Sequence, residues 1–154
     1  MKRALRWLLL LLIVGTMGCQ RGPGVEETRP YEAVKEDAQE FDRLIKEIRT
    51  ALTDARSALD NNDPQGATKK VESIQAPLAE ALQRLESMEK GLRPPKGRIA
   101  KEDLAAVRKF RKKLNTAMKE GQRIPRPVQR GDVEHLLSLV DDVLVGLEMR
   151  MVPR

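Results

Sequence analysis

Apolar side chains recur at alternating intervals of four and three residues in the first long amphipathic segment of the chain. The positions with this spacing are Val34, Ala38, Phe41, Ile45, Ile48, Leu52, Ala55 and Leu59. The spacing holds over about four heptads, and a strict 3.5-residue period is typical of helices that supercoil against partner helices. Leu44, Ala51 and Ala58 widen this stripe toward the face of a bundle helix. The pattern predicts a helix over residues 30–60, with Pro30 in its first turn.

The same spacing returns after a cluster of turn-forming residues at positions 61–64. The apolar positions of this second helix are Ala67, Val71, Ile74, Leu78, Ala81, Leu85, Met88 and Leu92. Asp63 is expected to cap the helix, and Pro64 suits its first position because no backbone N–H is needed there. Pro77 also lacks a donor and should bend the helix. One bent helix and two shorter helices are both open interpretations, and the continuous register favours the bent helix.

Two further amphipathic segments follow, each after a connector rich in glycine or proline. A third helix is expected over residues 100–120, ending at Gly121, and Arg111 interrupts its heptad pattern. Its apolar positions are Leu104, Val107, Phe110, Leu114, Ala117 and Met118. Asp132 is expected to cap a fourth helix. The apolar positions of that helix are Val133, Leu137, Val140, Leu144, Leu147 and Met151.

Four amphipathic helices joined by short connectors predict an all-α fold. The arrangement that suits them is an antiparallel up-down-up-down four-helix bundle with coiled-coil-like heptad packing. The first two helices are longer than the others, so a projecting hairpin is an alternative arrangement. Burial of one large aliphatic side chain contributes ~1.5–3 kcal/mol, and about twenty such positions can support a single domain.

The first 19 residues follow a different pattern, which has three parts. Lys2, Arg3 and Arg6 make the start basic, residues 7–14 form an unbroken apolar run, and four mostly small residues then lead to Cys19. A basic head, a short apolar run and a small-residue end are typical of a secretory signal. A spanning helix needs ~20 apolar residues to cross ~30 Å of hydrocarbon. A retained transmembrane helix is therefore the weaker interpretation.

This segment resembles the signal peptide of bacterial lipoproteins, because Gly18 and then Cys19 directly follow the apolar stretch. The resemblance implies that Cys19 receives a diacylglyceryl group on sulfur and becomes the first residue of the mature chain. Gln20, which stands where an aspartate would imply inner-membrane retention, implies an outer-membrane location facing the periplasm if the host has one. The alternative is an ordinary secretory signal with an incidental cysteine.

The predicted divisions of the chain follow from these two patterns. They are a signal peptide at 1–18, a lipidated N-terminus and flexible tether at 19–29, and a helical bundle domain at 30–154. The single cysteine excludes an internal disulfide framework, so stability must come from packing.

Composition limits the classes of function that the chain can have. Charged residues make up 34% and aromatic residues 3% of the sequence. Loss of three basic residues with the signal would leave 26 basic and 23 acidic residues, which reduces the formal charge from +6 to about +3. A mixed surface with so few aromatic residues for base stacking argues against nucleic-acid binding.

The sequence has no recognisable catalytic arrangement, so we expect a protein without enzymatic activity. His135 is the only histidine. It lies two residues after Val133, about 200° around the helix from it, and is therefore expected to face solvent. There is no Glu-x-x-His pair for a di-iron site, no Cys/His set for zinc and no Gly-x-Ser-x-Gly turn. We expect no cofactor; the alternative is a bundle that binds a small ligand, such as haem through His135 and Met88, a metal or an apolar molecule.

A basic cluster is expected at one end of the predicted bundle. In the up-down-up-down arrangement, the tether and the connector after the second helix share the end nearest the membrane. The basic residues at that end are Arg21, Arg29, Arg93, Lys96 and Arg98. Anionic headgroups attract such residues by ~1 kcal/mol each, and a lipid chain with a basic patch makes a two-signal anchor. An ordinary basic loop is the alternative interpretation.

The fourth predicted helix is apolar over a wide arc, and Val145 and Met149 lie roughly opposite its core stripe. Exposed apolar surface usually marks an interaction site, so these residues are the candidate partner face. The alternative is that this helix is the most deeply buried of the four. We therefore predict a non-enzymatic interaction or scaffold lipoprotein of the cell envelope, with a membrane and an envelope protein as partners. Heptads this regular could also serve self-association.

Overall fold

The structure, a computed structural model, describes residues 34–95 and 97–151. Its helices are α3 (Lys35–Asp60), α4 (Pro64–Ser73), α5 (Gln75–Gly91), α6 (Gly97–Arg123) and α7 (Arg130–Met151). These residues contain no strand. Because α4 and α5 meet end to end at Ile74, the described residues form four helices, and the prediction of an all-α fold is confirmed for this part of the chain.

Several predictions concern residues outside the described part of the chain. They are the signal peptide, Cys19, the tether with Arg21 and Arg29, the connector residue Lys96, and the first helix before Val34. These stay predictions.

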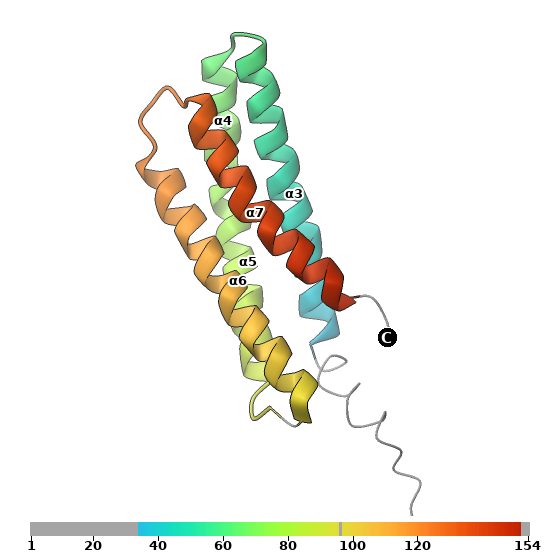
Figure 1. Cartoon of the computed structure of the whole chain (residues 1–154). Helices are drawn as coiled ribbons and strands as arrows, with labels where there is room; N and C mark the ends of the chain where they lie inside the picture. Colours follow the sequence, from blue (N-terminus) through green and yellow to red (C-terminus); the bar gives the residue numbers. More distant parts are fainter. Residues whose placement is uncertain (1–33, 96, 152–154) are drawn as a thin grey trace, which may run out of the picture.

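The helices pack side by side around one hydrophobic core (Figure 1). Helix α3 contacts α4, α5 and α7, whereas α6 contacts α5 and α7. Helices α3 and α6 therefore stand at opposite corners of the molecule. The turn at 61–63 and the connector at 124–129 lie at one end, and the connector at 92–95 lies at the other end with the start of α3 (Figure 1).

The apolar stripes of the first two helices lie in this core. Members of the first stripe from Val34 to Ala55 are at most 3% exposed, and members of the second are at most 5% exposed. Across the core the rings of Phe41 and Phe110 stack with their centroids 6.3 Å apart. This contact joins α3 to α6 between opposite corners. Each large side chain buried in this way stabilises the fold by ~1.5–3 kcal/mol.

The second helix begins as its sequence predicts. Oδ1 of Asp63 accepts a hydrogen bond of 2.8 Å from the backbone N–H of Gly66, and Pro64 occupies the first helical position. The cap satisfies one of the N–H groups that a helix leaves unpaired at its start.

The bend in the second helix falls at Ile74, one turn before Pro77. Proline has no N–H to donate to the carbonyl of Ser73, four residues earlier, so the ladder is interrupted there. The Leu78 N–H still donates to the Ile74 carbonyl at 2.9 Å. The buried positions therefore keep their register across the bend, as expected for one bent helix.

Two predicted helix ends are wrong. Helix α6 continues past Gly121, which is buried. A Cβ at this position would stand 2.8 Å from Nε2 of Gln75. This glycine permits close packing and does not end the helix. Asp132 is not the cap of α7, which begins two residues earlier at Arg130. Its Oδ2 instead accepts a hydrogen bond of 3.1 Å from the Gln129 N–H, from within the first turn.

Candidate functional site

Val145 and Met149, the predicted partner face, are the large hydrophobic side chains exposed in the described part of the chain. Val145 is 55% exposed and Met149 is 71% exposed. They stand four residues apart on α7, so they share one outward face. The core-facing positions of the same helix are Val133, Leu136, Leu137, Val140, Val143 and Leu147. None of the described helices covers the outward pair.

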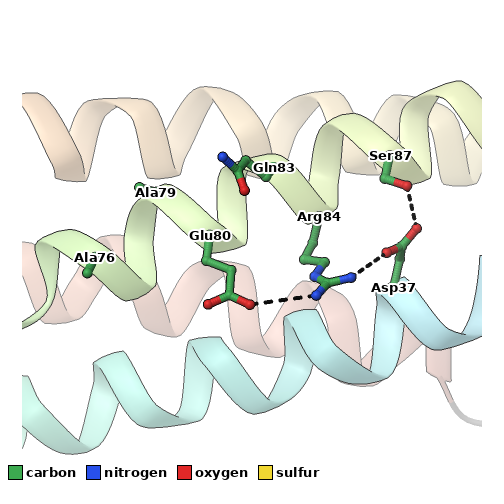
Figure 2. Close-up of a pocket in the computed structure, with 7 residues that line it drawn as sticks. All are labelled: Asp37, Ala76, Ala79, Glu80, Gln83, Arg84 and Ser87. Atoms are coloured by element: carbon green, nitrogen blue, oxygen red, sulfur yellow. Dashed lines mark hydrogen bonds and ion pairs between the residues drawn. The ribbon is translucent and has the colours of Figure 1, made fainter.

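A shallow groove of about 570 Å³ runs along the outer surface between α3 and α5. Its lining consists of Asp37, Ala76, Ala79, Glu80, Gln83, Arg84 and Ser87 (Figure 2). Figure 2 shows the guanidinium of Arg84 between the carboxylates of Asp37 and Glu80. Nη1 of Arg84 donates to Oδ1 of Asp37 at 3.2 Å, and Nη2 lies 3.6 Å from Oε1 of Glu80.

The polar network beside this groove joins two helices. The hydroxyl of Ser87 donates to Oδ2 of Asp37 at 2.6 Å, so both oxygens of that carboxylate are engaged. The hydrogen bond to Asp37 raises the pKa of Arg84 above its ordinary value. The groove lining contains neither histidine nor cysteine. The arrangement is therefore suited to holding α3 against α5 and offers no activated nucleophile.

Glu89 of α5 is the buried charged residue in the described part of the chain, at 5% exposure. Its Oε1 accepts hydrogen bonds from Nε of Arg108 at 3.0 Å and from Arg93. Its Oε2 lies 2.8 Å from Nη1 of Arg111. One carboxylate thus holds three guanidiniums, which come from the α5–α6 connector and from α6.

The electrostatics of this cluster explain how a carboxylate is buried there. The hydrogen bond from Arg108 lowers the pKa of Glu89, against the opposing effect of burial. The three guanidiniums and the one carboxylate give the cluster a net charge of +2. This cluster was not predicted from the sequence. Two features of the sequence pointed to it. Glu89 directly follows Met88, which is buried, and Arg111 interrupts the heptad pattern of the third predicted helix.

Two of the residues predicted for the basic end lie in the described part, at the end where α3 starts (Figure 1). Arg93 binds Glu89, and Nε of Arg98 donates to Oε1 of Glu102 at 2.9 Å. Both side chains are exposed, at 53% and 89%. Each has an acidic neighbour, so their charge is partly compensated.

His135 and Met88, the candidate haem ligands, are not brought together. The His135 side chain is 58% exposed, and its Nε2 lies 2.7 Å from Oε2 of Glu120. Met88 is buried near the end of α5, whereas His135 lies near the start of α7 at the other end of the molecule (Figure 1). Among the described residues, no three of His, Cys, Asp and Glu gather so that they could hold a metal ion.

The described helices also include none that is both long enough and apolar enough to span a membrane. No family model, curated protein or solved structure matches this chain.

Proposed function

We propose that this chain is a lipid-anchored extracytoplasmic protein of the cell envelope whose bundle acts as a non-enzymatic interaction module. The observation that carries the proposal is the pattern of residues 1–19. A basic head, an apolar run and small residues lead directly to the single cysteine of the chain, Cys19. This pattern resembles a bacterial lipoprotein signal, in which the cysteine becomes the lipid-bearing N-terminus. The proposed location is the outer membrane, facing the periplasm, in a host that has one.

The anchored domain in this proposal is an antiparallel up-down-up-down bundle with coiled-coil-like heptad packing. The alternating spacing of four and three residues in its first two helices supports this packing. The start of α3 and the connector at 92–95 lie at the same end (Figure 1). A tether that leads from Cys19 to α3 would bring Arg93 and Arg98 near the membrane, together with Arg21, Arg29 and Lys96.

The outward face of α7 is the proposed site for an envelope protein. Its apolar centre is Val145 and Met149, which are 55% and 71% exposed. Asp141 and Asp142 lie on the same helix and pair with Arg49 of α3 and Lys113 of α6. An apolar centre with a charged rim is the usual anatomy of a protein interface, in which Met is enriched.

Replacing Cys19 by serine tests the anchor. We expect the wild-type chain in the membrane fraction, with a diacylglyceryl group on Cys19 by mass spectrometry. The Cys19→Ser chain should either leave the membrane fraction or keep the mass of the uncut precursor. Ser57→Ala, an exposed substitution on α3, serves as the control and should change neither property. Unchanged membrane association and unchanged processing of Cys19→Ser would contradict the proposal.

A further inference from the structure

Positive charge is concentrated on one helix of the bundle. Helix α6 contains nine basic and three acidic residues, a net charge of +6. By contrast, α3 contains five basic and seven acidic residues, and α7 contains two basic and five acidic residues. Helix α3 stands at the corner opposite α6, and α7 lies next to α6, so the charge of the bundle is divided between a basic α6 and the acidic helices α3 and α7. Such a separation of charge orients a protein in an external field.

Much of the charge on α6 is not compensated by neighbouring carboxylates. Four of its exposed cations form no ion pair with any described residue: Lys101, Lys112, Lys119 and Arg123. The acidic side chains of Glu102 and Glu120, on the same helix, pair with Arg98 and His135. The nine basic residues of α6 outnumber its three acidic residues, Glu102, Asp103 and Glu120, so the helix keeps an excess of positive charge.

The unpaired cations are aligned along the helix. Lys101, Lys112, Lys119 and Arg123 are separated by 11, 7 and 4 residues, which are all close to whole numbers of helical turns. They extend over 22 residues, or ~33 Å of helix. We call these four residues, together with Arg108, the α6 basic face.

A groove lies in the middle of the α6 basic face, and ion pairs with Glu89 hold two of its arginine side chains. A groove of about 400 Å³ is lined by Arg108, Arg111, Lys112, Asn115, Thr116 and Lys119, which recur at helical spacing. Buried Glu89 fixes the guanidiniums of Arg108 and Arg111 from the neighbouring helix. Fixing these side chains in advance lowers the entropy lost when they meet an anion.

We propose that the α6 basic face docks on anionic phospholipid headgroups, so that the bundle lies along the membrane that holds its anchor. The inference rests on the proposed function for the anchor at Cys19. A lipid chain by itself gives reversible attachment, and a polybasic surface supplies the second signal. Each basic residue near an anionic surface adds attraction equivalent to about fivefold in the docked population, or ~1 kcal/mol.

The composition of the face favours a lipid surface over a protein partner. Lysine is depleted in protein interfaces, whereas aromatic residues and Met are enriched at their centres. Three of the five members of the face are lysines, and the exposed large hydrophobic residues of the described chain stand on α7 instead. A straight line of cations also suits a flat surface of evenly distributed charge. Docking through α6 leaves Val145 and Met149 on a different helix for the protein partner.

Lysine labelling of the full chain on vesicles tests the orientation. The vesicles contain phosphatidylcholine alone or with about one-third phosphatidylglycerol as the anionic lipid. Mass spectrometry then measures how fast an amine-reactive reagent modifies each lysine. We expect the rates at Lys101, Lys112 and Lys119 to fall by about fivefold or more on anionic vesicles and to recover in high salt. Lys69, an exposed cation on α4, should react equally on both vesicles.

A matched pair of double variants ties the protection to the α6 basic face. Lys112→Gln with Lys119→Gln removes two of its cations and should restore the labelling of Lys101 toward the rate on neutral vesicles. Arg56→Gln with Lys69→Gln removes the same charge from α3 and α4, where neither residue forms an ion pair with a described residue, and should leave Lys101 protected.

Three outcomes would overturn the docking proposal. They are equal labelling on both vesicles, equal protection on both vesicles, and protection that follows protein density rather than lipid charge, as expected for contact between two proteins. The mass of the Cys19 peptide in the same digest reports on the anchor separately. An unmodified Cys19 with protected α6 lysines would refute the lipid anchor and leave the docking face standing.

Discussion

The aromatic ring of Phe110 on α6 occupies the space that a side chain at position 146 of α7 would need. A Cβ on Gly146 would stand 2.7 Å from Cε1 and 3.0 Å from Cζ of that ring. The same ring stacks on Phe41 of α3. Three helices therefore meet at one side chain, and Gly146 sets how closely α7 approaches it.

Gly146→Ala should destabilise the bundle through this contact. Overpacking of a well-filled core typically costs ~1–3 kcal/mol. Gly131→Ala is the control, because it lies on the same helix and a Cβ there meets nothing within 4 Å. The free energies of unfolding of both variants in urea are compared with that of the wild type. Equal stability of the two variants would show that the Phe110 ring moves aside without cost.

Glu89→Gln should weaken the fold and change its response to acid. The pKa of Glu89 is lowered from its ordinary value of 4.5, chiefly by the hydrogen bond from Arg108. A carboxyl whose pKa is lower in the folded state stabilises the fold above its unfolded pKa, and that stabilisation is lost as pH falls through the folded pKa. We therefore expect the variant to lose ~1–3 kcal/mol at neutral pH and to show a shallower loss of stability below pH 4.5.

Urea unfolding at a series of pH values measures both effects. Glu148→Gln, an exposed carboxylate of α7, is the matched control and should keep the wild-type pH profile. If Glu89→Gln also kept that profile, the three arginines would not be stabilising the carboxylate in the folded state.

Asp63→Ala should remove the cap of the second helix. Loss of such a cap usually costs ~1 kcal/mol, because the Gly66 N–H would lose the acceptor now at 2.8 Å. Thermal unfolding followed by circular dichroism should give a lower midpoint for this variant. Gln65→Ala, an exposed change in the same turn, should leave the midpoint close to the wild type. A wild-type midpoint for Asp63→Ala would mean that water replaces the cap without loss.

The double variant Val145→Ala with Met149→Ala should weaken partner binding without changing the stability of the fold. Both side chains are exposed, so the free energy of unfolding should change by no more than about 0.5 kcal/mol. Recovery of a crosslinked partner from the native envelope should fall, because the apolar centre of the proposed interface is gone. Gln39→Ala with Gln83→Ala places the same number of changes on α3 and α5 as a control. Unchanged recovery by the α7 variant would refute the partner face.

Much of the helical layout could be predicted from residue spacing and turn chemistry. The stripe from Val34 to Ala55 is buried, Asp63 caps the second helix and Pro77 bends it without shifting its register. These features depend on residues a few positions apart, so a local pattern contains them. Two predicted helix boundaries, at Gly121 and Asp132, were wrong for different reasons. Gly121 lies inside α6 and packs against Gln75. Asp132 lies in the first turn of α7 and accepts a hydrogen bond from the Gln129 N–H, which precedes the helix.

The candidate functional surfaces also include some features that the sequence predicts and others that only the structure shows. The sequence by itself determined that Val145 and Met149 lie opposite a core stripe and that Cys19 follows a signal-like segment, because both are matters of spacing along the chain. Only the tertiary structure decided that Glu89 meets Arg108 and that α6 stands at the corner opposite α3. These relationships join residues on different helices. They depend on which helices become neighbours in the bundle, and the apolar period of a single helix shows which side faces the core but not which helix lies there.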